Sequence, residues 1–268
     1  MASAPALVLI GAGKMGAALL GGWLAAGISP RDIAVVEPHP SDAIRSLAAE
    51  SGFALNGAPR PAPTVVLAIK PQMLDEAAPG VALWLEPDSL LISILAGKTV
   101  ANLSRRLPAK KIVRAMPNTP AAIGRGITGA FANPDVTPAQ RDMAQKLLSG
   151  VGAVEWVGSE QAIDAVTAIS GSGPAYVFLL VEALAKGGEA LGLPADLALR
   201  LARATVEGSG ELLHRAPETS AETLRKNVTS PGGTTQAALD VLMARDGLAA
   251  LLTRATAAAA RRAGELAG

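Results

Sequence analysis

The sequence predicts an α/β protein in which a doubly wound parallel sheet comes first and an all-α domain follows. The first half of the chain alternates short apolar runs with stretches of helical character, whereas no convincing strand follows about residue 160. Strands buried on both faces are apolar throughout, and their alternation with helices is typical of a parallel sheet. We therefore expect one domain over residues 1–160 and a helical domain over residues 161–268.

Five short apolar runs are the expected strands of the first domain. They lie at residues 6–10, 33–36, 64–69, 90–94 and 111–115. Residues 15–26 and 42–51 are the clearest helical stretches between them. Because each run is apolar at nearly every position, we expect its strand to lie between two layers of helices.

The second half is rich in alanine and leucine, and three of its segments are long enough for substantial helices. They span residues 176–191, 194–214 and 247–266. Small residues on their faces allow neighbouring helices to approach closely. The segments are also too apolar for a monomer surface, so we expect a partner chain to cover part of them.

The composition excludes several classes of protein. Half of the 268 residues are apolar and 18% are charged, so the chain can bury a sizeable core. The net charge is +1 without a long basic run, which argues against nucleic-acid binding. The chain has no cysteine, and its two histidines, His39 and His214, stand far apart, so no metal site is expected.

Residues 7–28 are apolar enough to suggest a signal peptide or a membrane span. Lys14 lies in the middle of this stretch, no basic residue precedes it, and several of its residues are glycines. These features argue against both interpretations. We expect a cytoplasmic protein that is not bound to a membrane.

Residues 11–16, GAGKMG, form a G-x-G-x-x-G pattern between the first expected strand and the first expected helix. In a Rossmann-type fold Gly11 permits the tight turn, Gly13 lets the backbone approach a pyrophosphate, and Gly16 permits close packing of helix and strand. The helix N-terminus, at Lys14 and Met15, offers unpaired N–H groups to the phosphates. A glycine-rich turn without a ligand is the alternative, but strand, turn and helix together favour dinucleotide binding.

Glu37 ends the second expected strand, about twenty residues beyond the glycines. An acidic residue at this place commonly accepts a hydrogen bond from the 2′-hydroxyl of the adenosine ribose. A solvated carboxylate at a strand end is the alternative. No arginine follows at once to meet the 2′-phosphate of NADPH, so Glu37 predicts a preference for NADH.

Three further segments follow expected strands of the first domain. They are residues 68–71, which include Ala68, Lys70 and Pro71, residues 93–97, which include Ala96, and residues 116–120, which include Asn118. In open α/β sheets the ligand lies beyond the carboxyl ends of the strands. Each segment therefore either lines a nicotinamide pocket or is an ordinary turn, and position alone leaves both interpretations open.

Residues 228–235, VTSPGGTT, precede a helical stretch at 236–244. Pro231 and the paired glycines form a tight turn whose N–H groups can converge on a carboxylate or a phosphate at the helix start. In the alternative interpretation Thr234 or Thr235 simply caps the helix. Spacing alone does not decide between the two.

The segment 169–176, ISGSGPAY, is either a phosphate loop or a closely packed helix entry, and we favour the helix entry. No Ser-His-Asp set, P-loop lysine or carboxylate pair stands out in the sequence. A reductase needs few ionisable side chains, because the hydride chemistry belongs to its nicotinamide cofactor.

Taken in order, these segments resemble those of pyrroline-5-carboxylate reductases, and the likeness spans nearly the whole chain. The matching segments are 11–16, 68–71, 114–120, 170–176 and 227–235. Residues 230–235, SPGGTT, are the most specific, because dehydrogenases generally lack them. The resemblance implies a Rossmann-type first domain, an all-α C-terminal dimerisation domain and NAD(P)H-dependent reduction of 1-pyrroline-5-carboxylate to L-proline. It also implies a homodimer, five of which often assemble into a decamer.

The resemblance assigns roles to individual residues of the second half. The backbone N–H groups of Gly232, Gly233 and Thr234 would hold the substrate carboxylate, and Thr235 would hydrogen-bond the ring nitrogen. Ser230 belongs to the same loop, and Glu218 maps near it. The candidate cofactor residues are Gly11, Gly13, Lys14, Met15, Gly16, Glu37, Ala68, Lys70, Pro71, Ala96 and Asn118.

The sequence departs from the family at Glu37, where many members carry a small hydroxyl or a basic residue. Two other functions are alternatives to the one that the resemblance implies. A β-hydroxyacid dehydrogenase, or another imine reductase of this layout, relies on a lysine at the start of a helix in the second domain, whereas Lys186 lies inside a helical stretch. A non-catalytic dinucleotide-sensing dimer would not need the complete SPGGTT turn.

Overall fold

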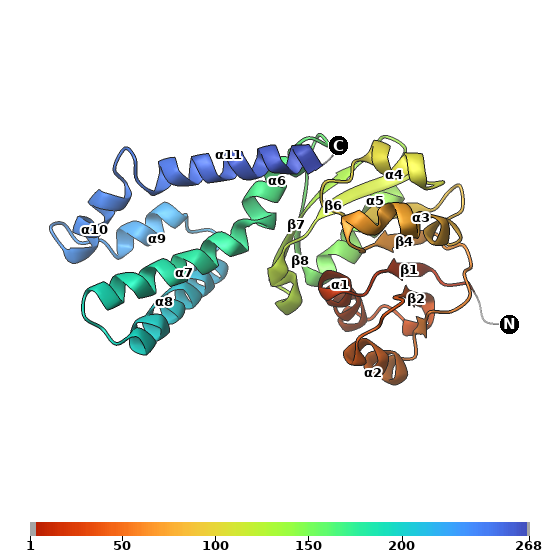
Figure 1. Cartoon of the computed structure of the whole chain (residues 1–268), viewed down its shortest axis with the longest axis horizontal. Coiled ribbons are helices and arrows are strands. Elements are labelled where there is room, and N and C mark those ends of the chain that lie inside the picture. Colours follow the sequence, from red (N-terminus) through yellow and green to blue (C-terminus); the bar gives the residue numbers. More distant parts are fainter. Residues whose placement is uncertain (1–3, 267–268) are drawn as a thin grey trace. The chain divides into compact units, whose positions relative to one another are not determined.

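The computed structural model describes residues 4–266, which form two compact units (Figure 1). The first unit contains the chain up to Gly171 together with the end of the last helix from Ala259, and the second comprises Ser172–Ala258. A nearly continuous helical stretch begins at Ala162 and crosses the point where the units divide. The domain boundary near residue 160 therefore stays a prediction.

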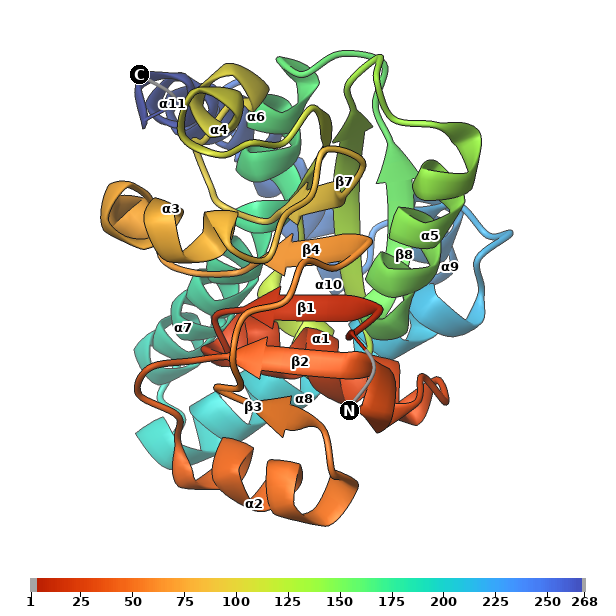
Figure 2. The same ribbon diagram turned by 90° about the vertical axis from the view of Figure 1, so that its right-hand side faces the viewer.

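The first unit contains an eight-stranded sheet with the strand order β3-β2-β1-β4-β5-β6-β7-β8. The strands are β1 (Leu7–Ile10), β2 (Ile33–Val36), β3 (Ala54–Leu55), β4 (Thr64–Leu67), β5 (Leu90–Ser93), β6 (Lys111–Met116), β7 (Gly126–Ala132) and β8 (Gly152–Trp156). Neighbouring strands are parallel except for β6 and β7. Figure 2 shows β3, β2, β1 and β4 in this order. The predicted α/β class is confirmed.

Helices cover both faces of the sheet, which explains why its central strands are apolar at every position. The helices of this unit are α1 (Lys14–Ala25), α2 (Asp42–Ser51), α3 (Leu74–Ala82), α4 (Val100–Arg106), α5 (Pro138–Leu148) and α6 (Ala162–Val166). Leu9 belongs to a core that includes Trp23 of α1, and Val8 belongs to a second core with Leu74 of α3. Each fully buried side chain of this size contributes about 1.5–3 kcal/mol to folding.

Three strands, β3, β7 and β8, were not expected from the sequence, and β7 departs from the expected parallel sheet. The connection from Met116 to Gly126 consists of a short 3₁₀ segment, Thr119–Ile123, and no crossover helix. A parallel neighbour needs a crossover of a dozen or more residues, so β7 returns antiparallel to β6. Glycines within β7, and the single charged residue and alternating burial of β8, hide both strands from a search for continuous apolar runs.

The second unit is built from helices, and the described residues after 160 contain no strand, as predicted. Its helices are α7 (Gly173–Ala190), α8 (Ala195–Arg215), α9 (Ala221–Asn227), α10 (Thr234–Leu242) and α11 (Leu248–Leu266), of which α11 continues into the first unit. The helices α7 and α8 pack side by side (Figure 1). A Cβ on Gly188 would lie 3.0 Å from the Cβ of Ala198, so this pair approaches closely through small residues, as expected.

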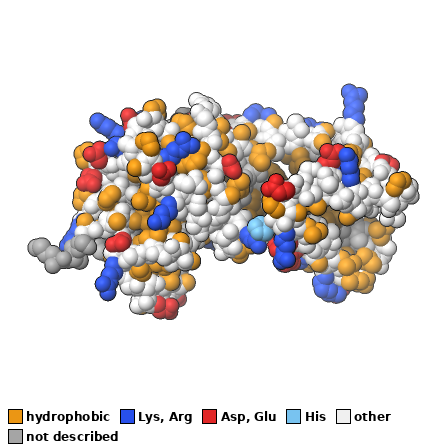
Figure 3. All heavy atoms as spheres, turned by 180° about the vertical axis from the view of Figure 1, so that it is seen from behind, with side chains coloured by type: hydrophobic (Ala, Val, Ile, Leu, Met, Phe, Trp, Pro, Cys, Tyr) orange, Lys and Arg blue, Asp and Glu red, His pale blue; other side chains and the backbone are white. Residues whose placement is uncertain are grey.

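Apolar side chains remain exposed over most of the second unit. Within a single turn of α7, Val177, Phe178, Leu179 and Leu180 are 44%, 62%, 62% and 45% exposed, and Figure 3 shows further hydrophobic side chains gathered at the α7–α8 hairpin. Among the described residues, the stretch Ala162–Ala190 is the one that is long and apolar enough, by length and composition only, to cross a membrane. A helix turn that is apolar on all sides is normally buried, so we expect a partner to cover residues 177–180.

Candidate cofactor and substrate sites

The glycine turn joins β1 to α1, and its three glycines have three different surroundings. Gly11 has φ +96°, and a Cβ there would lie 2.8 Å from the carbonyl carbon of Ala68. A Cβ on Gly16 would lie 2.1 Å from the carbonyl oxygen of Gly11, so only glycine fits. A Cβ on Gly13 would have nothing within 4 Å. Space is therefore left open at the position where a pyrophosphate must approach the backbone.

The N-terminus of α1 has no side-chain cap. Gly13 is the N-cap residue and offers no side chain to the first turn. The N–H groups of Lys14 and Met15 have no partner inside the helix, because the first turn of any helix lacks preceding carbonyls. With the positive end of the helix dipole they can hold an anion. The open turn thus fits the pyrophosphate of a dinucleotide.

Glu37 lies directly beyond the end of β2, and its carboxylate is bonded to the glycine turn. The Ala12 N–H donates to Glu37 Oε2 at 2.9 Å, and the His39 N–H donates to Oε1 at 3.1 Å. The Glu37 carboxylate is therefore held by two backbone N–H groups, and its contact with a ribose stays a prediction. Each carboxylate oxygen can accept a second hydrogen bond, so both remain able to receive a ribose hydroxyl.

The remaining candidate cofactor residues follow β4, β5 and β6, whose parallel register places their carboxyl ends at the same edge of the sheet as the glycine turn. The Ala68 N–H donates to the Ile10 carbonyl at 2.7 Å, and Lys70 is the exposed N-cap of the 3₁₀ segment Pro71–Met73. Ala96 is half-buried in the loop after β5. Asn118 is buried, and its Oδ1 accepts the Ile127 N–H at 3.0 Å. The structure thus gathers these candidates along one edge, and the Asn118 side chain also holds β7.

Sequence reasoning missed an ion pair that supports this edge. Arg114 of β6 is buried, its side chain being 5% exposed, and its Nη1 donates to Glu160 Oε1 at 2.8 Å. The same oxygen accepts the N–H of Val100, the first residue of α4, at 2.6 Å. The pair therefore ties β6 to the segment that follows Ala96. An arginine inside an otherwise apolar strand was the available signal, because a buried charge requires a partner.

A second ion pair, between Arg106 of α4 and Asp75 of α3, includes none of the predicted site residues. Its hydrogen bond and charge hold the pKa of the Asp75 carboxyl below its ordinary value and raise the pKa of the Arg106 guanidinium. Asp75 is exposed and Arg106 is half-buried, so solvent screens the pair and its contribution to stability is small. The pair links α3 to α4, which lie on the same face of the sheet.

The candidate substrate loop lies in the second unit, before α10. The Gly233 N–H donates to the Ser230 carbonyl at 3.0 Å, which closes a tight turn in which Gly232 has φ +70°. Gly233 is the N-cap of α10, and no side chain caps that helix. The alternative in which Thr234 or Thr235 caps the helix is therefore wrong, and the first N–H groups of α10 remain able to bind an anion.

The segment at 169–176 is a helix entry, as favoured from the sequence. Residues Thr167–Gly171 form a π-helical turn, and the Ser170 hydroxyl donates to the Val166 carbonyl at 3.0 Å. α7 then begins at Gly173 with Pro174 in its first turn. The Ser170 hydroxyl is thus committed to the helix backbone.

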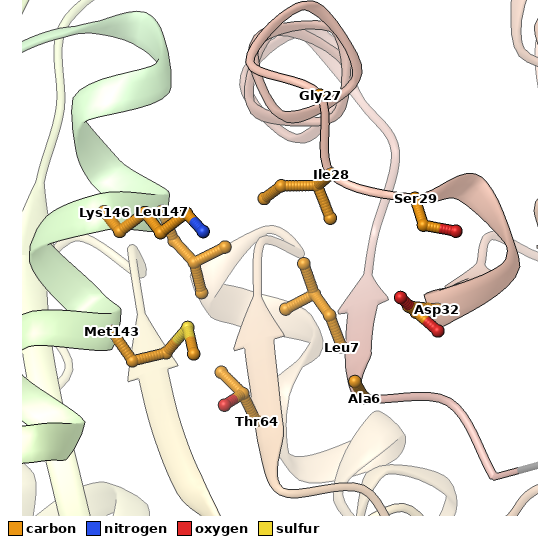
Figure 4. A pocket seen from close by; sticks show the side chains of 10 residues that line it. All are labelled: Ala6, Leu7, Gly27, Ile28, Ser29, Asp32, Thr64, Met143, Lys146 and Leu147. Atoms are coloured by element: carbon orange, nitrogen blue, oxygen red, sulfur yellow. The ribbon is translucent and has the colours of Figure 1, made fainter.

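A cavity of about 350 Å³ lies at the opposite edge of the sheet, beside the start of β1 and β4 (Figure 4). Leu7, Ile28 and Leu147 form apolar walls, and Lys146 and Asp32 stand on opposite sides. None of the predicted site residues lines it. Among the residues that the structure describes, no group of three or more His, Cys, Asp or Glu side chains is arranged to hold a metal ion.

A doubly wound sheet with an open glycine turn, followed by a helical unit, defines a dinucleotide-dependent oxidoreductase of the two-domain type. Residues 160–266 match the family model described as pyrroline-5-carboxylate reductase dimerisation, and residues 6–97 match the one described as NADP oxidoreductase, coenzyme F420-dependent.

Relatives and solved structures agree with these matches. The chain is 41% identical to a pyrroline-5-carboxylate reductase of Pseudomonas aeruginosa over 99% of this chain and 98% of the relative. It resembles the structure of a pyrroline-5-carboxylate reductase from Coxiella burnetii with a TM-score of 0.87 and 36% identity, over 99% of this chain and 100% of that one. A pyrroline carboxylate reductase from Plasmodium falciparum, solved with NADP bound, has a TM-score of 0.80 and 27% identity over the full length of both chains.

The chain belongs to the pyrroline-5-carboxylate reductase family. It is accordingly an NAD(P)H-dependent oxidoreductase that associates with itself through its helical half. The comparisons do not favour the β-hydroxyacid dehydrogenase alternative, and Lys186 lies well inside α7 rather than at a helix start.

Proposed function

We propose that this chain reduces 1-pyrroline-5-carboxylate to L-proline, with hydride supplied by NAD(P)H. The observation that carries the proposal is the uncapped SPGGTT turn at the start of α10, in a chain that is 41% identical to a pyrroline-5-carboxylate reductase over 99% of its length. Oxidation of NADH or NADPH, followed by absorbance on addition of pyrroline-5-carboxylate, tests it. Absence of turnover with both cofactors would refute the proposed activity.

The residues of this chain bind and orient the imine, which accepts the hydride. When bound, the reduced nicotinamide supplies the hydride and its electron pair to the imine carbon, and the ring nitrogen gains a proton. The N–H groups of Gly232, Gly233 and Thr234 would hold the substrate carboxylate, with Ser230 shaping the turn. Thr235 would orient the ring nitrogen. Fixing the carboxylate and the ring nitrogen of the substrate would bring its imine carbon to about 3–3.5 Å from the carbon that donates the hydride.

Thr235→Ala should lower kcat/KM for the imine by about 2- to 10-fold, because one hydrogen bond to a polar substrate is worth about 0.5–1.5 kcal/mol. The dissociation constant for NADH should stay unchanged, since Thr235 belongs to the substrate loop. The fold should persist because Thr235 does not cap α10. Thr253→Ala is the matched control, since that hydroxyl bonds only the Ala249 carbonyl of its own helix. Full activity of Thr235→Ala would remove Thr235 from the mechanism.

For the cofactor we propose a preference for NADH, based on Glu37. Two like charges a few ångströms apart repel by roughly 1–4 kcal/mol, so the Glu37 carboxylate disfavours the 2′-phosphate of NADPH at least about fivefold. Glu37→Ser should reduce the difference in kcat/KM between NADH and NADPH, mainly through a lower KM for NADPH. Glu50→Ser, on the exposed side of α2, is the control. Better use of NADPH than NADH by the unmodified enzyme at about pH 7.5 would contradict the proposal.

We further propose that a second copy of this chain covers the exposed apolar faces of α7 and α8, and that such dimers associate further into a decamer. The description of residues 160–266 as a dimerisation region supports a protein partner for the apolar stretch in preference to lipid. We propose a cytoplasmic location without bound nucleic acid. The near-neutral charge of the chain supports the last point.

A further inference from the structure

Asn56 has an unusual backbone conformation beside the cofactor edge. Among the described residues it is the one non-glycine residue with a positive φ, +54°. It directly follows β3, whose last residue, Leu55, pairs with Val35 of β2. The Asn56 N–H continues this ladder with a 2.8 Å bond to the Val35 carbonyl. Phe53, which directly precedes β3, is buried and anchors the segment in the core.

The Asn56 carboxamide binds both backbone groups of Glu37. Its Oδ1 accepts the Glu37 N–H at 2.8 Å, and its Nδ2 donates to the Glu37 carbonyl at 2.9 Å. The side-chain amide thus takes the place of a peptide group in a strand that has already ended. The positive φ turns the main chain out of the ladder while the side chain continues it. This conformation is tolerated by asparagine but disfavoured for most other residues.

These bonds form a chain of contacts that ends at the glycine turn. Asn56 holds the Glu37 backbone, and the Glu37 carboxylate accepts the Ala12 N–H between Gly11 and Gly13. Without Asn56 the Glu37 backbone would lose both of these bonds, and the residue would be held through its carboxylate alone, by the N–H groups of Ala12 and His39. The two bonds from Asn56 therefore restrict where the Glu37 carboxylate can stand.

We propose that Asn56 is a positioning residue for cofactor selection: it fixes the Glu37 backbone so that the carboxylate stays at the ribose end of the dinucleotide site. This inference rests on the proposed contact between Glu37 and the ribose. A fixed carboxylate repels a 2′-phosphate, whereas a carboxylate free to move away accommodates it. Discrimination between NADH and NADPH thus depends on Asn56 through Glu37.

Asn56→Gly is the informative variant, because glycine accepts the positive φ and removes only the carboxamide. The ratio of NADPH to NADH dissociation constants, measured by quenching of tryptophan fluorescence, should fall by about 3- to 10-fold. This binding measurement does not depend on turnover of the imine. It therefore tests the role of Asn56 even if the chain does not reduce pyrroline-5-carboxylate.

Asn133 offers a matched control in the same sheet. Its Oδ1 accepts the Ile112 N–H at 3.0 Å and its Nδ2 donates to the Lys110 carbonyl at 2.7 Å, at the opposite edge of the sheet. Asn133→Ala removes an equivalent pair of backbone bonds far from the glycine turn. It should lower the melting temperature and leave the cofactor ratio unchanged, so a change in ratio cannot be attributed to general loosening of the sheet.

A double-mutant cycle with Glu37→Ser decides whether Asn56 acts through Glu37. In the Glu37→Ser background, Asn56→Gly should change the cofactor ratio by less than about twofold, because coupled residues are not additive. An equal effect in both backgrounds would mean that the carboxamide itself contacts the cofactor, and would overturn the proposal. An unchanged ratio in Asn56→Gly, or in Glu37→Ser alone, would also overturn it.

Discussion

Gly13→Ala is expected to give a protein as stable as the parent that binds NADH and NADPH about 100-fold more weakly. The added Cβ meets nothing within 4 Å in the folded chain, and Gly13 has φ −66°, which alanine adopts without strain. The methyl group instead occupies the space that a pyrophosphate requires. Hydrogen bonds to a charged group contribute about 1.5–3 kcal/mol each, so losing two of them weakens binding by about 100-fold or more. Thermal melting and titration with each cofactor measure the two effects separately.

Gly16→Ala is the paired control, because the clash there lies inside the protein. The new Cβ would stand 2.1 Å from the Gly11 carbonyl oxygen, so the helix must shift away from β1. We expect a lower melting temperature as well as weaker cofactor binding. If Gly13→Ala bound both cofactors as the parent does, the pyrophosphate would not lie against this turn.

Phe178→Asp should convert the dimer into a monomer at micromolar concentration. Phe178 is 62% exposed in the isolated chain, on a turn of α7 that is apolar on all sides. If a second copy covers it, the substitution removes about 1.5–3 kcal/mol of apolar burial and adds a desolvated carboxylate that costs several more. The association constant should fall by at least about 100-fold. Sedimentation velocity provides the measurement.

Leu83→Asp is the matched control for this prediction. Leu83 ends α3 in the first unit and is 58% exposed, so it offers a comparable side chain outside the helical half. Its substitution should leave the association state unchanged. A Phe178→Asp protein that sedimented as the parent does would place the interface away from this turn of α7.

Local signals in the sequence predicted part of the fold closely. Strand β2 and helix α2 begin and end at the expected residues, because Ser41 caps the helix and Gly52 ends it in the left-handed conformation. Strands β7 and β8 were missed because their pairing depends on neighbours far along the chain. Gly126 and Gly152, for example, approach so closely that a side chain would not fit between the strands.

The candidate site was predictable in position but not in its bonds. The spacing of Glu37 from the glycines placed it at the correct edge of the sheet, since the motif and strand β2 are adjacent in sequence. Its bonds to Ala12 and Asn56 depend on β3, a strand of two residues without a periodic signal. The uncapped start of α10 likewise depends on the turn closing at Ser230, which threonine spacing alone did not reveal.

The exposed apolar turn of α7 at residues 177–180 has a consequence for how this protein acquires its stability. If a second copy covers this turn, part of the free energy that stabilises the helical unit is gained only on association, so unfolding of that unit is linked to dissociation of the two chains. The midpoint of thermal unfolding then rises with protein concentration and falls on dilution. A melting temperature of this protein is accordingly meaningful only together with the chain concentration at which it is measured.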